Sequence, residues 1–211
     1  MFSRAALIRS YRGVGALLIL VAVGYQVNSG LEAGHWHAVN YFSYFTILSN
    51  LIAAGVLLWG ALRRGGPPSE TFQLLRGAAV LYMATTGIVY ALVLSGKPPP
   101  IAWVNTVVHQ LMPVVVALDW VIDPPGVPLS FRRTLLWMGF PVAYIAYTLI
   151  RGASVDWYPY FFVDPRRAGG YPRVAVSCLA VGVGIIALAL CIAWIANRRV
   201  TQRRTLLEAS H

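Results

Sequence analysis

Six long apolar stretches set the pattern of the chain, and three of the five connections between them carry arginine. Each stretch has about 17 to 23 residues, enough for a helix to cross the ~30 Å hydrocarbon layer of a bilayer. No flexible linker or internal repeat divides them. We therefore predict an all-α fold in which residues 1–211 form one bundle of six transmembrane helices, at Gly13–Ser29, Tyr41–Leu62, Gly77–Ser95, Ile101–Ile122, Thr134–Ile150 and Val174–Ala196.

The composition agrees with a membrane protein. Of the 211 residues, 58% are hydrophobic and only 11% are charged, which is too few charges to cover a soluble domain of this length. The net charge of +10 would indicate nucleic-acid binding in a soluble protein, but the arginines cluster at the ends of apolar stretches, where topology and anionic headgroups account for them. Bilayer lipids, and not nucleic acid, are the expected partners. An alternative for the first stretch is a secretory signal, which would leave five spans.

The distribution of positive charge predicts that both termini face the cytoplasm. Twelve of the 17 Lys and Arg residues fall on the side of the termini: Arg4, Arg9, Arg12, Arg63, Arg64, Arg76, Arg132, Arg133, Arg198, Arg199, Arg203 and Arg204. The other side has Lys97, Arg151, Arg166, Arg167 and Arg173.

Two polar side chains inside the spans are the candidates for function. Thr46 lies in the stretch FSYFTILSN and His109 in the stretch WVNTVVHQLMP. Polar groups in lipid cost free energy unless they are hydrogen bonded, so their presence favours a functional site. With the predicted orientation, Thr46 lies ~8 Å and His109 ~12 Å below the outer ends of their spans, and the two side chains can meet if these spans are neighbours.

Each of these spans carries a polar stripe in its outer half, within an arc of about 100°: Ser43, Thr46 and Asn50 on the second span, and Asn105, His109 and Pro113 on the fourth. Such stripes are expected to face the bundle interior or a water-filled cavity. Pro113 predicts a kink that frees the carbonyl of His109. Purely structural roles remain open, because a threonine commonly bonds a backbone carbonyl one turn earlier and the two asparagines can join helices.

Asp119 is a third candidate within the spans, and it is the one that carries a full charge. It lies ten residues after His109, which is ~15 Å along a helix, so the two cannot share a catalytic triad. We expect a carboxylate at the cytoplasmic interface, near Asp123, Arg132 and Arg133.

The six-span layout, the FT-containing second span, the histidine of the fourth span and the segment YPYFFVD before the last span resemble the androgen-induced membrane protein family and its bacterial relatives. The family's characterised animal members are intramembrane threonine hydrolases that cleave fatty acid esters of hydroxy fatty acids. The resemblance implies that Thr46 is the nucleophile and His109 the base, and that the chain lies in a bacterial inner (plasma) membrane. It implies no role for YPYFFVD.

The chemistry that this resemblance implies requires a base within ~2.6–3.2 Å of the threonine hydroxyl and hydrogen-bond donors for the oxyanion. Asn50 and Asn105 are the candidate oxyanion or orienting groups, and Ser43 is a further candidate. Metal and cofactor are not expected. A haem would need a second histidine within a span, whereas His35 and His37 lie in a connection.

The sequence leaves open an alternative function and alternative roles for two segments. The polar stripes can line the pocket of a non-catalytic lipid or small-molecule transporter or sensor. The HWH segment that contains His35 and His37 is predicted to be an interfacial loop, with a two-ligand metal site as the alternative. The aromatic residues of Trp157–Asp164 are predicted to anchor the chain at the interface, with a lid over an outward-facing cavity as the alternative.

Overall fold

The computed structural model describes residues 3–34, 36–63, 66, 68–96, 98–126 and 128–208, with side chains described as far as Gln202. Within these residues, six helices are long and apolar enough to cross a membrane. This confirms the predicted all-α, six-span architecture and indicates a multi-pass integral membrane protein.

The spans differ in regularity. α1 (Arg4–Glu32), α3 (Phe45–Leu62) and α10 (Tyr171–Glu208) are continuous α-helices. The other three contain tighter or wider turns: α4 (Glu70–Val89) ends in a π turn (Tyr90–Leu94), α5 (Ala102–Thr106) continues through a π turn (Val107–Leu111) into α6 (Met112–Ile122), and α7 (Phe131–Thr134) continues through a 3-10 turn (Leu135–Met138) into α8 (Gly139–Val155). The short elements are α2 (Ala38–Tyr41), a 3-10 turn (Phe161–Val163) and α9 (Pro165–Ala168).

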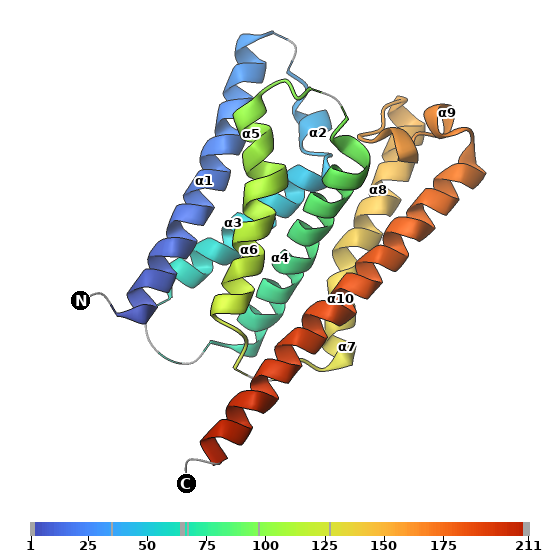
Figure 1. Ribbon diagram of the computed structural model, residues 1–211. Coiled ribbons are helices and arrows are strands. Elements are labelled where there is room, and N and C mark those ends of the chain that lie inside the picture. The colour runs from blue at the N-terminus through green and yellow to red at the C-terminus, as the bar shows by residue number, and fades with distance from the viewer. Residues whose placement is uncertain are drawn as a thin grey trace.

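α4 occupies the middle of the bundle, where it packs against α3, α6 and α10, while α1 packs against α3 and α6 (Figure 1). The two chain ends lie at one end of the bundle, together with α7. The connections that contain α2 and α9 lie at the opposite end (Figure 1). We call these the termini end and the α9 end.

Most helices extend beyond the predicted spans because polar residues cap them outside the apolar stretch. Ser3 accepts a hydrogen bond from the Ala6 N–H at the start of α1, and Ser69 does the same for Phe72 in α4. The second span is the exception, since the predicted start at Tyr41 is wrong. Tyr41 ends α2, and a turn separates it from α3, which begins at Phe45.

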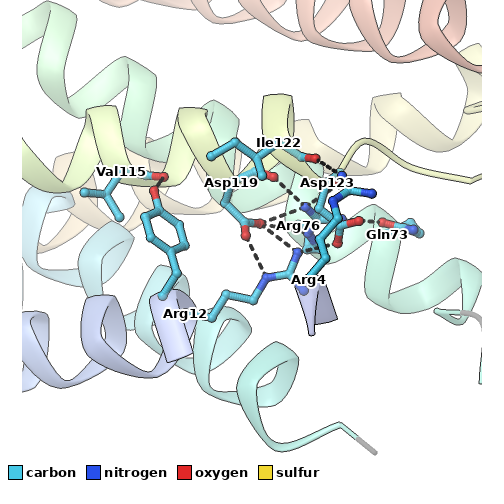
Figure 2. Close-up of polar contacts among 9 residues, drawn as sticks. Arg4, Arg12, Gln73, Arg76, Val115, Asp119, Ile122 and Asp123 are labelled. Carbon is cyan, nitrogen blue, oxygen red and sulfur yellow. Dashed lines mark hydrogen bonds and ion pairs between the residues drawn. The ribbon is translucent and has the colours of Figure 1, made fainter. Parts of the chain in front are cut away.

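A buried ionic cluster joins three spans near the termini end (Figure 2). The carboxylate of Asp119 in α6 accepts hydrogen bonds from Arg12 of α1 at 2.6 Å and from Arg76 of α4 at 2.7 Å. Asp123 accepts a further bond from Arg12 at 2.7 Å, and Gln73 accepts one from Arg76 at 2.9 Å. Arg12, Arg76 and Asp119 are each at most 5% exposed. Charges buried to this extent are tolerated only when paired, so the cluster fixes α1, α4 and α6 against one another.

The expected partners of Asp119 were wrong. Sequence reasoning assigned it to Arg132 and Arg133, which are close to it in the chain, whereas the partners come from two other spans. Arg133 instead pairs with Glu70 at the start of α4. Helix packing, and not chain proximity, decides which charges meet.

Asp119→Asn is expected to destabilise the fold by about 3–5 kcal/mol, because it leaves two buried guanidinium groups without their counter-charge. The measurement is the denaturation midpoint of the purified protein in detergent. Asp156→Asn is the matched control, since its pair with Arg166 is largely exposed and is worth about 0–1 kcal/mol. Equal stability of the two variants would contradict a structural role for the cluster.

Candidate functional site

Thr46 and His109 meet inside the bundle. Thr46 is the second residue of α3, and His109 lies in the π turn between α5 and α6. The distance between Thr46 Oγ1 and His109 Nε2 is 3.2 Å, which is hydrogen-bonding distance. Thr46 is buried and His109 is partly buried. The predicted convergence of the two side chains is confirmed, although Thr46 lies in the first turn of its helix and not a full turn below it.

Hydrogen bonds fix the orientation of the His109 ring. Its Nδ1 lies 3.3 Å from the backbone carbonyl of Asn105, and a carbonyl only accepts, so Nδ1 carries the proton. Nε2 is then left with a lone pair that faces Thr46. The ring of Tyr90 stacks on the imidazole at 4.4 Å, and the Tyr90 hydroxyl accepts a bond from the Asn105 side chain at 2.7 Å. Asn105 therefore has the predicted orienting role, exerted through its backbone carbonyl.

Irregular backbone surrounds this pair. Pro113 has no N–H to complete an α-helical bond, and the preceding turn is π-helical, with the Met112 N–H bonded to the carbonyl of Val107. α4 approaches closely at Gly87, where a Cβ atom would lie 3.0 Å from the Pro113 ring. The kink predicted from Pro113 thus takes the form of a π turn that contains His109.

Asn50 is not free to stabilise an oxyanion. Its amide nitrogen donates to the carbonyl of Thr46 at 2.8 Å and to the carbonyl of Val108 at 3.1 Å, which uses both of its N–H groups. The prediction of Asn50 as an oxyanion donor is therefore wrong. Its role is to tie the turn of Thr46 to the turn of His109.

Ser43 also lies apart from the pair. It belongs to the turn before α3 and not to the helix, so the helical stripe predicted for it does not exist. Its hydroxyl donates to the carbonyl of Val39 at 2.6 Å and shares a hydrogen bond of 2.8 Å with the Tyr147 hydroxyl. Among the described contacts, none joins Ser43 to the Thr46 and His109 side chains.

Tyr160 is a site residue that sequence reasoning missed. Its hydroxyl accepts a hydrogen bond from the backbone N–H of Thr46 at 3.4 Å and lies 3.5 Å from Thr46 Oγ1. The first N–H groups of a helix have no partner within the helix, and here tyrosine hydroxyls take that place, with Tyr144 accepting from the Phe45 N–H at 3.1 Å. Burial raises the pKa of Tyr160, which keeps its hydroxyl protonated and able to donate.

The segment Trp157–Asp164 holds Tyr160 over the start of α3. The rings of Trp157 and Tyr160 pack edge-on against Tyr44, at centroid distances of 5.7 and 5.6 Å. At the end of the segment Asp164 accepts two hydrogen bonds from the Arg166 side chain, which lower the pKa of that carboxyl. Tyr160 thus contacts the site through its hydroxyl, a role that the prediction of interfacial anchoring did not include. The anchoring of the segment at the interface stays a prediction.

A cavity and a groove flank the pair. The cavity, of about 340 Å³, lies between α3, α4, α8 and α10, and Thr46 and Tyr160 form part of its wall. The groove runs along α4 and α6 and is lined by His109, Tyr90 and Gln110. Thr46 therefore stands between an apolar cavity on one side and its histidine partner, which borders the groove, on the other.

The possible metal site of the HWH segment stays a prediction, because His35 lies outside the described residues. Lys97 and Arg64, which entered the charge count, also lie outside them. Within the described part, no group of three or more His, Cys, Asp or Glu side chains could hold a metal ion.

Gly152→Leu is expected to displace the aromatic segment, because a Cβ atom at Gly152 would lie 2.1 Å from the ring of Tyr158. The measurement is the rate of trypsin cleavage after Arg166 and Arg167, which should rise at least fivefold. Gly139→Leu is the matched control on the same helix, since a Cβ atom there meets nothing within 4 Å. Equal cleavage rates in the two variants would contradict this account of how Tyr160 is held.

The arrangement combines a hydroxyl, an oriented imidazole with a free lone pair, a protonated phenol and an apolar cavity, which are the components needed for acyl transfer to a hydroxyl. Comparisons with protein-family models, with curated proteins and with solved structures find no match for this chain.

Proposed function

We propose that the protein is an integral-membrane hydrolase of lipid carboxylic esters, in which Thr46 is the nucleophile and His109 the general base. The observation that carries this proposal is the 3.2 Å contact between Thr46 Oγ1 and His109 Nε2, with Nδ1 of the same ring directed at the Asn105 carbonyl. A threonine hydroxyl is a weak nucleophile at neutral pH and needs a base at about this distance. The resemblance to intramembrane threonine hydrolases of fatty acid esters of hydroxy fatty acids supports the same assignment.

The first half of the proposed reaction forms an acyl-enzyme. Thr46 Oγ1 attacks the ester carbonyl carbon as its proton moves to His109 Nε2, and the carbonyl π electrons move to the oxygen. When the tetrahedral intermediate collapses, His109 returns this proton to the departing alkoxide, which leaves as an alcohol. The acyl group is then esterified to Thr46.

Tyr160 is the proposed oxyanion donor. Its hydroxyl accepts from the Thr46 N–H, which leaves its own proton free to bond the oxygen of the intermediate. The positive end of the α3 dipole lies at the same place, because Thr46 is in the first turn of the helix. A phenol polarised by a backbone N–H is a stronger donor than either group alone.

The second half of the reaction requires water. A water molecule that enters by the groove at His109 gives one proton to Nε2 as its oxygen attacks the acyl carbon. When the second tetrahedral intermediate collapses, the bond to Thr46 Oγ1 breaks and His109 returns this proton to Oγ1, which releases the carboxylic acid and restores both residues. We also propose that both termini face the cytoplasm of a bacterial inner membrane, as the arginine distribution favours. The α9 end, which carries the site, would then face the outer surface, close to water.

Thr46→Ala is expected to reduce ester hydrolysis to the uncatalysed background, and His109→Ala to reduce kcat by about 10²–10⁴-fold. The assay is cleavage of p-nitrophenyl and lipid esters by protein purified in detergent. Thr134→Ala and His37→Ala are matched controls, since the Thr134 hydroxyl donates to the Phe131 carbonyl of its own turn and His37 is exposed.

Two results would overturn the proposal. Wild-type turnover in folded Thr46→Ala and His109→Ala variants would exclude the catalytic pair. Recovery of bound ester intact after long incubation with the wild-type protein would favour a non-catalytic lipid carrier or sensor.

Tyr160→Phe is expected to lower kcat by about 10²–10³-fold with little change in KM, because the lost hydrogen bond is made mainly in the transition state. Tyr158→Phe, two residues away in the same segment, keeps its ring against Gly152 and should keep wild-type kcat. A Tyr160→Phe variant that raises KM at unchanged kcat would show that Tyr160 serves binding and not oxyanion stabilisation.

A further inference from the structure

We propose that the cavity beside Thr46 is a tunnel for the acyl chain of the ester, open to the bilayer at its far end, and that Gly182 keeps it clear. This inference rests on the proposed function and names the part of the substrate that enters the cavity. It implies esters of unbranched fatty acids as the substrate class, with the acyl carbon at Thr46 and the chain pointing away from it.

The distribution of polar groups gives the cavity a direction. The hydroxyls of Thr46, Tyr144 and Tyr160 gather where the cavity meets the start of α3. Elsewhere most of the wall is aliphatic or aromatic, apart from two threonines of α4, Thr85 and Thr86. A ligand that suits this lining has one polar end and a long apolar remainder.

The length of the cavity suits an extended hydrocarbon chain. The wall formed by α4 and the π turn that follows it runs from Thr85 to Leu94, and the α10 wall runs from Cys178 to Ile186. These stretches of nine and eight helical steps correspond to ~12–14 Å, which is about ten methylene groups in the staggered, extended conformation.

The cavity opens sideways. Val142 of α8 and Ile186 of α10 both line it, yet they are 63% and 51% exposed, so they lie at its mouth on the surface of the bundle. In a membrane this surface faces acyl chains. A substrate tail longer than the cavity can therefore continue into the bilayer, and the wild-type site sets no sharp upper limit on chain length.

Gly182 is the position where the tunnel can be blocked. It lines the cavity on α10, and a Cβ atom there meets nothing within 4 Å, so a larger side chain grows into the tunnel without a clash at its base. A Cβ atom at Gly184 also meets nothing within 4 Å, but Gly184 is exposed and does not line the cavity. It lies two residues after Gly182, which is ~200° around the helix. Gly184 is therefore the matched control for substitutions at Gly182.

The test compares Gly182→Phe with Gly184→Phe on p-nitrophenyl esters of butyric, octanoic, lauric and palmitic acids. For wild type and Gly184→Phe, kcat/KM is expected to rise from butyrate to laurate and then to stay level. For Gly182→Phe, kcat/KM is expected to fall at least tenfold on laurate and palmitate but to stay within twofold on butyrate. Gly182→Leu, with a smaller side chain, replaces the Phe variant if that variant does not fold.

Failure of this inference is distinguishable from failure of the proposed function. If Thr46→Ala is inactive but Gly182→Phe affects all chain lengths equally or not at all, the tunnel is refuted and the hydrolase stands. Equilibrium binding of radiolabelled lauric acid gives a second readout that needs no turnover. Gly182→Phe should weaken it at least tenfold relative to Gly184→Phe, and equal binding would refute the tunnel even if Thr46 proves not to be catalytic.

Discussion

The paired charges around Asp119 are the constraint on which the rest of the bundle depends. Helices in lipid gain little from burying apolar surface against one another, because lipid tails are equally apolar. A carboxylate held between Arg12 and Arg76 supplies directional contacts that apolar packing lacks, and it joins α1, α4 and α6 at one level. Tyr90 directly follows α4, and His109 lies in the π turn that directly precedes α6. The ion pairs, ~15 Å away along the helix, therefore help to set where the imidazole lies.

The opposite end of the bundle is built from irregular backbone. In a bilayer every backbone N–H and carbonyl must find a partner, so departures from the α-helix are tolerated only where other groups satisfy them. Two π turns and the first turn of α3 meet around Thr46, and their polar groups are taken up by side chains of neighbouring elements. Asn50 bonds the carbonyls of Thr46 and Val108, and Tyr160 bonds the Thr46 N–H. The groups that complete the backbone thus also position the reactive side chains.

Sequence reasoning reached the six spans from the length of the apolar stretches. Depth in the membrane showed that Thr46 and His109 can meet if their spans are neighbours, and the structure supplies that adjacency. Sequence reasoning did not reach Tyr160, which is separated from Thr46 by more than one hundred residues and sits in a segment whose aromatic composition also suits an interface. Nor could it assign the role of Asn50, because the sequence does not show whether the amide of an asparagine within a span contacts a substrate or a backbone carbonyl. Three-dimensional packing decides these points, and the arginine partners of Asp119 are a further example.

The placement of Thr46 also bears on how a hydrolase can work within a membrane. The acyl chains of esters partition into apolar surroundings, whereas hydrolysis needs water. A single open chamber would either expose the acyl chain to water or exclude water from the reacting carbonyl. In the proposed reaction the two requirements are met on opposite sides of one residue. The cavity of α8 and α10 receives the chain, and the groove of α4 and α6 reaches His109 from the other side. In the second half of the proposed reaction His109 must take a proton from water, and His109 lines the groove and not the cavity that would hold the acyl chain. Water can therefore reach the base without passing the apolar chain.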